Sequence, residues 1–176
     1  MQLLFLRYTR GMVCEKEIAR SEIQSRVAAL TQEDYLVLSS AVQQHIRQWF
    51  SEYTKQRATL SVLLYSAIHS WREVDISWLA FEFPQHQYII ALPHRDAPIS
   101  RQTFDIIFVP LFGMNSENYR LGHGAGWYDK MLQSQPAACK VGVGFELSRI
   151  NFRPQNHDIP MDVIFTEVPF EQTKIR

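Results

Sequence analysis

Hydrophobic and polar positions change their spacing once along the chain. Up to about residue 53 the apolar residues recur at helical spacing, and beyond that point they gather into short runs. Residues 15–30 carry apolar positions among charges at near-helical spacing, which predicts a first helix. Thr31 and Asp34 are placed to cap a second helix, which continues to about Tyr53 with one apolar stripe and a polar outer face.

The rest of the chain alternates apolar runs with helical patterns. The runs are "TLSVLLY", "YIIALP", "FDIIFVPLF", "CKVGVGFE" and a weaker "DVIFTE". Near-continuous apolar runs are typical of strands buried on both faces of a parallel sheet. Helical patterns occur at "ISWLAFEF", which Asp75 can cap, and at "GWYDKMLQSQ". This alternation predicts a three-layer α/β domain with a mainly parallel central sheet.

Composition and charge favour a single domain that acts on small molecules. The chain has 176 residues, of which 46% are hydrophobic and 20% charged. Lys plus Arg is 18 and Asp plus Glu is 18, so no electrostatic attraction to nucleic acid or an anionic membrane is expected. Two scattered cysteines, Cys14 and Cys139, indicate a reducing cytoplasm rather than a disulfide framework or a CxxC metal site. We expect a cytoplasmic monomer.

A short apolar run lies near the start of the sequence, ahead of the first predicted helix. The run "LLFL" is too short for the core of a signal peptide and much too short to span a membrane. We interpret residues 1–12 as an N-terminal extension and residues 13–176 as one domain. Translation can start at Met1 or at Met12, and the sequence leaves both open.

The stretch "YRLGHGAGWYDK", residues 119–130, contains three of the chain's 7 glycines. It follows a predicted strand and precedes a predicted helix, on the side of a parallel sheet where ligands bind. Backbone N–H groups there can face an anion, with Arg120 as a nearby cation and Asp129 as a candidate Mg²⁺ ligand. A structural turn is the alternative. The GxGxG spacing matches neither a Walker A motif nor a dinucleotide fingerprint.

The same stretch resembles the "RLGxGxGYYDR" signature of the 5-formyltetrahydrofolate cyclo-ligase family, also called methenyltetrahydrofolate synthetase. Further segments resemble family motifs in the same order, namely "KEIAR", "EVD", "DIIFVPLFGMN" and "HDIPMDVIFTE". The resemblance runs from about Lys16 to Glu167. It implies the Rossmann-like, three-layer fold of that family. It also implies conversion of 5-formyltetrahydrofolate to 5,10-methenyltetrahydrofolate, using ATP and Mg²⁺ and releasing ADP and phosphate.

In the reaction that the resemblance implies, the formyl oxygen attacks the γ-phosphate, N10 attacks the activated carbon, and phosphate leaves. The protein then mainly positions the reactants and neutralises charge. The resemblance implies catalytic roles for Arg120 and Tyr128, and Mg²⁺ ligation by Asp129 and Asp162. Substrate contacts are implied for Glu73, Trp127 and Tyr128. The implied ATP contacts are Lys16, Arg20, Arg120, Leu121, Gly122, His123, Gly124, Ala125, Gly126, Trp127 and Tyr128.

Several of these residues also have a purely structural interpretation. Lys16 and Arg20 lie one helical turn apart, which is typical of a solvated helix surface. Asp129 can stabilise the start of a helix, and Asp162 can be a turn residue before a strand. His123 occupies a variable family position, so we assign it no role in proton transfer.

The resemblance is fuller in the nucleotide half than in the folate half. Only "ISRQT" lies between "IIALPHRDAP" and "FDIIFVPLF", where the family has a few tens of further residues that wall the folate pocket. We therefore expect ATP recognition to be better retained than folate recognition. Three functions stay open: the cyclo-ligase reaction, binding of a nucleotide or small anion without folate turnover, and a regulatory or interaction role on the same fold.

Overall fold

The computed structural model describes residues 15–91, 102–124 and 126–169. Residues 1–12, interpreted above as an N-terminal extension, lie outside the described residues. So does Ala125, which was expected to contact ATP. The elements in chain order are α1 (Glu15–Ala28), α2 (Gln32–Thr54), β1 (Ser61–Tyr65), the 3-10 turn η1 (His69–Trp71), α3 (Leu79–Glu82), β2 (Gln87–Ala91), β3 (Ile106–Pro110), β4 (Gly113–Met114), β5 (Arg120–Leu121), α4 (Trp127–Gln133), β6 (Cys139–Val143), the 3-10 turn η2 (Glu146–Ser148) and β7 (Val163–Phe165).

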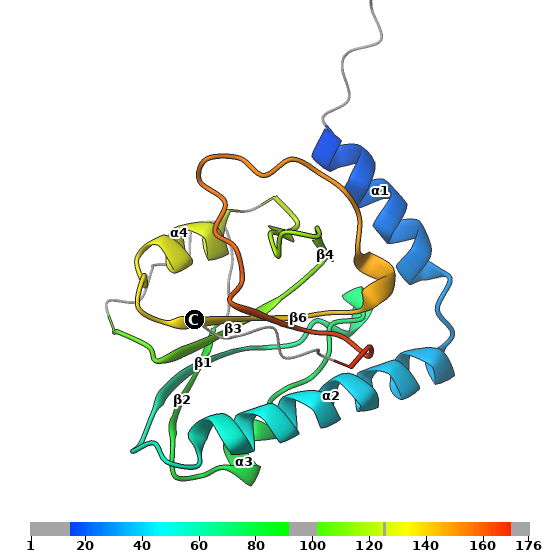
Figure 1. The fold of residues 1–176 in the computed structure, drawn as a ribbon. Helices are drawn as coiled ribbons and strands as arrows, with labels where there is room; N and C mark the ends of the chain where they lie inside the picture. Colours follow the sequence, from blue (N-terminus) through cyan, green and yellow to red (C-terminus); the bar gives the residue numbers. More distant parts are fainter. Residues whose placement is uncertain (1–14, 92–101, 125, 170–176) are drawn as a thin grey trace, which may run out of the picture.

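Five strands form one sheet in the order β2-β1-β3-β6-β7, and every neighbouring pair is parallel. Helices α2 and α3 lie on one side of this sheet, and α4 lies on the other with β4 (Figure 1). The predicted α/β fold with a mainly parallel sheet is therefore confirmed. The antiparallel β4–β5 ribbon was not predicted, because each of its strands has only two residues.

Helix α2 begins where the sequence predicts. The hydroxyl of Thr31 accepts the Asp34 N–H at 3.0 Å, and the Asp34 carboxylate accepts the Thr31 N–H at 3.1 Å. This reciprocal capping satisfies two N–H groups that the first helical turn leaves without partners. The apolar stripe of α2 packs on the sheet, where Trp49 meets the rings of Phe108 and Phe165. No helix among the described residues is long and apolar enough to cross a membrane.

Two local predictions are wrong. Only one helical turn, Leu79–Glu82, forms where a longer helix was expected, and Asp75 does not cap it. The Asp75 carboxylate instead accepts the N–H of Ser77 at 2.8 Å, ahead of that turn. Strand β2 is not buried on both faces, since Ile89 is 38% and Ile90 53% exposed. The reason is its position as the outer strand of the sheet, where fewer neighbours cover its side chains.

We expect His86 to make the core sensitive to acid. Its Nδ1 accepts the backbone N–H of Leu60 at 3.2 Å, and its ring packs edge-on against Phe50. This contact requires an unprotonated Nδ1, and burial lowers the pKa of His86 below its ordinary value of 6.5. As the pH falls below 6.5, His86 gains a proton in the unfolded chain before it does so in the folded chain. The free energy of unfolding therefore decreases with acidification.

A His86→Gln variant keeps a hydrogen-bond acceptor but cannot titrate. We expect the free energy of unfolding of the wild type to fall more steeply between about pH 7 and pH 5 than that of the variant. Urea unfolding at several pH values measures both slopes, and the other histidines cancel in the comparison. Parallel slopes would show that His86 does not cause the acid sensitivity.

Candidate active site

A cavity of about 280 Å³ lies at the carboxyl ends of β1 and β3, where Ser66 and Pro110 line it. This is the side on which open parallel sheets bind ligands. Helix α1, the loop after β1, the glycine loop and a C-terminal segment surround it. The sequence-predicted residues that line the cavity are Lys16, Arg20, Glu73, Arg120, Leu121, Gly122, His123, Gly124, Gly126, Trp127, Tyr128 and Asp129.

The glycines of this loop serve two different physical needs. Gly124 and Gly126 have φ angles of 93° and 70°, which side chains strongly disfavour. Gly126 directly precedes α4, so its conformation turns the chain into that helix. Gly122 instead permits a close approach, because an added Cβ would lie 2.5 Å from Nη1 of Arg120. The loop thus combines a tight turn with room for a buried guanidinium.

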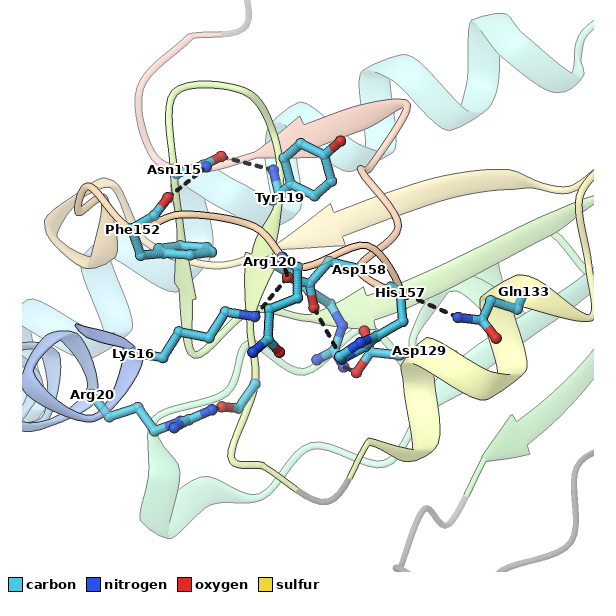
Figure 2. A network of polar contacts seen from close by, with 12 residues as sticks. Lys16, Arg20, Asn115, Tyr119, Arg120, Asp129, Gln133, Phe152, His157 and Asp158 are labelled. Carbon is cyan, nitrogen blue, oxygen red and sulfur yellow. Dashed lines mark hydrogen bonds and ion pairs between the residues drawn. The ribbon is translucent and has the colours of Figure 1, made fainter. Parts of the chain in front are cut away.

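Arg120 is a buried cation held next to an acid and an aromatic ring. Its Nη2 donates to Asp129 Oδ2 at 3.0 Å, and its guanidinium lies 5.2 Å from the centre of the Tyr128 ring. The turn before it is fixed by Asn115, whose Oδ1 accepts the Tyr119 N–H at 2.9 Å while its Nδ2 donates to the Phe152 carbonyl (Figure 2). These contacts orient the guanidinium before any ligand binds.

Two polar atoms of this site have no hydrogen-bond partner among the described residues, namely Nε of Arg120 and the hydroxyl of Tyr128. Both residues line the cavity and are only 8% exposed. Burial raises the pKa of Tyr128, and the nearby Glu73 carboxylate adds to the effect, so the phenol stays protonated and can donate. Buried polar atoms are rarely left without partners, which indicates that a polar ligand completes this site.

Helix α1 brings two cations, Lys16 and Arg20, to the cavity, and the alternative interpretation of them as solvated surface residues is wrong. Lys16 Nζ lies 2.6 Å from Asp158 Oδ2, with a side chain only 12% exposed. Arg20 Nε donates to the Gly122 carbonyl at 2.9 Å (Figure 2). Burial works to raise the pKa of Asp158, but the hydrogen bond and charge of Lys16, together with a hydrogen bond from the Gln155 backbone, outweigh it. That pKa is lowered overall, and the carboxylate stays ionised.

Glu73 supplies an acid on the loop after β1. Its Oε2 accepts the N–H of Ile68 at 2.8 Å. Burial raises the pKa of Glu73, and that hydrogen bond opposes the rise only in part. The carboxyl group therefore sits in a poorly solvated position within the cavity, where a hydrogen bond from a ligand N–H group is worth more than in water.

Comparisons with known proteins identify the family. The model of the 5-formyltetrahydrofolate cyclo-ligase family matches residues 73–167, more than half of the chain. The chain belongs to the 5-formyltetrahydrofolate cyclo-ligase family. The cyclo-ligase of Mycoplasma pneumoniae is 34% identical over 36% of this chain and 39% of that protein. The Haemophilus influenzae cyclo-ligase is 33% identical over 32% of each chain. The aligned segments thus span well under half the length of these relatives.

Solved structures of cyclo-ligase family members extend the likeness to most of the fold. A 5,10-methenyltetrahydrofolate synthetase from Mycoplasma pneumoniae superimposes with a TM-score of 0.70 and 24% identity, covering 86% of this chain and 98% of that one. The synthetase of Aquifex aeolicus gives 0.62 and 25% identity, covering 88% and 90%. Because almost all of the Mycoplasma chain has a counterpart here, the short central interval removes little of the fold relative to that protein.

The two acids expected to share Mg²⁺ in a cyclo-ligase do not come together. Asp129 lines the cavity, but Asp162 does not. The Asp162 carboxylate accepts the backbone N–H of Lys140 at 2.8 Å, near the amino end of β6 and thus at the opposite end of the sheet. A metal site built on both residues therefore does not form in this structure. Among the described residues, no group of three or more His, Cys, Asp or Glu side chains is placed to hold a metal ion.

Sequence reasoning missed several residues of the cavity. Asp158 lies in the segment "HDIPMDVIFTE" that resembles a cyclo-ligase motif, so the motif itself contained the signal. Ile68 and Trp71 also line the cavity, from the segment just before "EVD". Their place became visible only when the fold put that segment against the glycine loop.

Proposed function

We propose that this protein converts 5-formyltetrahydrofolate to 5,10-methenyltetrahydrofolate, with ATP as co-substrate and Mg²⁺ as the accompanying ion. One observation carries the proposal. A single cavity is lined by the glycine loop, by the cations Lys16, Arg20 and Arg120, and by the acid Glu73. Family membership supports the substrate class. We further propose that the protein works as a cytoplasmic monomer, with no nucleic acid or membrane as partner.

The cations and the glycine loop form the phosphate side of the proposed site. Backbone N–H groups of a glycine loop can approach phosphate oxygens closely, and cations nearby offset the negative charge. Arg120 is the best placed, because its buried guanidinium is already oriented by Asp129 and its Nε has no hydrogen-bond partner among the described residues. Preorganised donors of this kind stabilise charge in a transition state without a reorganisation step.

The proposed reaction has two displacements. The formyl oxygen attacks the γ-phosphorus, and the bond from that phosphorus to ADP breaks. N10 then attacks the formyl carbon and loses its proton, and the carbon–oxygen bond to phosphate breaks. Arg120 offsets charge on the transferred group, and the protonated hydroxyl of Tyr128 donates a hydrogen bond to one of its oxygens. Glu73 holds the folate ring by accepting its N–H groups.

Mg²⁺ would be held by Asp129 in this proposal. Mg²⁺ commonly uses one or two carboxylates and completes its shell with substrate phosphates and water, so a full cage of protein ligands is not required. Asp129 lines the cavity beside the glycine loop and keeps 18% of its side chain exposed. Bound Mg²⁺ would neutralise phosphate charge during the transfer.

A direct assay tests this function. The protein is mixed with ATP, Mg²⁺ and 5-formyltetrahydrofolate, and the absorbance of methenyltetrahydrofolate is followed. We expect it to rise only when all three are present, and to rise at least about 100-fold more slowly with an Arg120→Gln variant. Nucleotide binding without product would favour the anion-binding alternative. If the protein neither binds nucleotide nor forms product, a regulatory or interaction role would be favoured.

A further inference from the structure

An aromatic wall borders the cavity on the side of Glu73. It consists of Trp71 and His123, which line the cavity, with Phe112 packed behind His123. The Trp71 and His123 rings lie 3.8 Å apart between centroids at 34°, and Phe112 lies 4.4 Å from the His123 ring at 49°. Trp71 stays 46% exposed despite this stacking, and it lines the cavity two residues before Glu73. A large aromatic surface therefore faces the ligand space, and among the described residues only the smaller His123 ring stacks on it.

The backbone that presents Trp71 is held in a strained conformation. Arg72 has φ 57° and ψ 33°, a left-handed conformation that non-glycine residues seldom adopt. Its guanidinium is fixed by hydrogen bonds to Gln32 and the Leu30 carbonyl, and lies over the Tyr35 ring. Strain of this kind persists only where surrounding contacts enforce it, and it concentrates at ligand sites.

The same turn fixes Trp71 and Glu73 relative to each other. The Trp71 N–H donates to the Ile68 carbonyl at 2.9 Å, and the Ile68 N–H donates to the Glu73 carboxylate at 2.8 Å. The turn brings an indole and an acid to the cavity but no cation, because Arg72 is not among the lining residues. That chemistry suits a flat heterocycle with N–H donors better than a polyphosphate.

We propose that Trp71, backed by His123, determines specificity for the reduced folate, its indole packing on the flat part of the pterin ring while Glu73 accepts the ring N–H groups. This inference rests on the proposed function. An aromatic surface fixed in advance loses little conformational freedom when it binds a ring, which favours affinity. Burial, together with the charges of Arg120 and Arg20, lowers the pKa of His123, so its ring remains a neutral backing for the indole.

Three variants test the inference. Trp71→Ala removes the surface, Trp71→Phe restores a smaller ring, and Phe81→Ala is the matched control, because Phe81 is an 85% exposed aromatic residue that does not line the cavity. Calorimetric titration is done separately with 5-formyltetrahydrofolate and with a non-hydrolysable ATP analogue. Circular dichroism checks that each variant is folded.

We expect Trp71→Ala to weaken folate binding by about 10-fold or more and Trp71→Phe to recover most of it. The affinity for the ATP analogue should change by less than about 2-fold, and Phe81→Ala should change neither ligand. Unchanged folate affinity in Trp71→Ala would overturn this inference alone, as would an equal loss for the ATP analogue. A wild-type protein that does not bind 5-formyltetrahydrofolate would overturn the proposed function as well.

Discussion

A Gly124→Val variant is expected to fold like the wild type and to bind an ATP analogue at least about 10-fold more weakly. Gly124 has a φ of 93°, where a β-branched side chain is strained by about 1–3 kcal/mol. The residue is exposed on a loop, so the strain can be relieved by moving the loop rather than by unfolding the core. A moved loop no longer presents its N–H groups to phosphate. Calorimetric titration with the analogue measures the loss.

A second substitution separates strain from steric hindrance. Asn adopts positive φ far more readily than Val, so Gly124→Asn keeps more of the native backbone while adding a side chain. Among the described residues, an added Cβ there meets only Arg20 Nη2, at 3.9 Å, so these residues leave room for it. If Gly124→Asn still binds the ATP analogue and Gly124→Val does not, the loss of binding is caused by the changed backbone conformation. ATP binding that survives in Gly124→Val would remove the loop from the proposed phosphate site.

Most of the cavity lining was predictable because its residues follow one another in a motif. The segment from Arg120 to Asp129 comes after the buried strand β3 and runs into helix α4, so its position on the ligand side follows from the topology of a parallel sheet. The capping box at Thr31 was predictable for a similar reason, since both of its partners lie within one turn. Local sequence is informative where the interacting groups are local.

Long-range pairs explain what sequence reasoning missed. Lys16 and Arg20 were assigned an alternative surface role because their partners, Asp158 and the Gly122 carbonyl, lie far along the chain. Asp162 was placed with Asp129 by motif resemblance alone, although the chain carries it to the other end of the sheet. The stacking of Trp71 on His123 likewise depends on a contact that no local pattern records.

Substitutions at the acids distinguish a metal ligand from a residue that only orients Arg120. Asp129→Asn keeps the shape of the side chain but removes its charge. If Asp129 holds Mg²⁺, the Mg²⁺ concentration for half-maximal turnover should rise by about 10-fold or more. If it only orients Arg120, turnover should fall at every Mg²⁺ concentration, and the half-maximal concentration should stay as in the wild type.

Asp158 and Asp162 provide the controls for that measurement. Asp158 is a cavity acid paired with a cation, as Asp129 is, so Asp158→Asn tests whether losing any such charge alters the Mg²⁺ requirement. Asp162→Asn removes charge outside the cavity, and its side-chain oxygen can still accept the Lys140 N–H. We expect neither control to shift the Mg²⁺ titration. A shift in Asp162→Asn without one in Asp129→Asn would reverse the assignment, since the metal would then depend on the acid at the opposite end of the sheet.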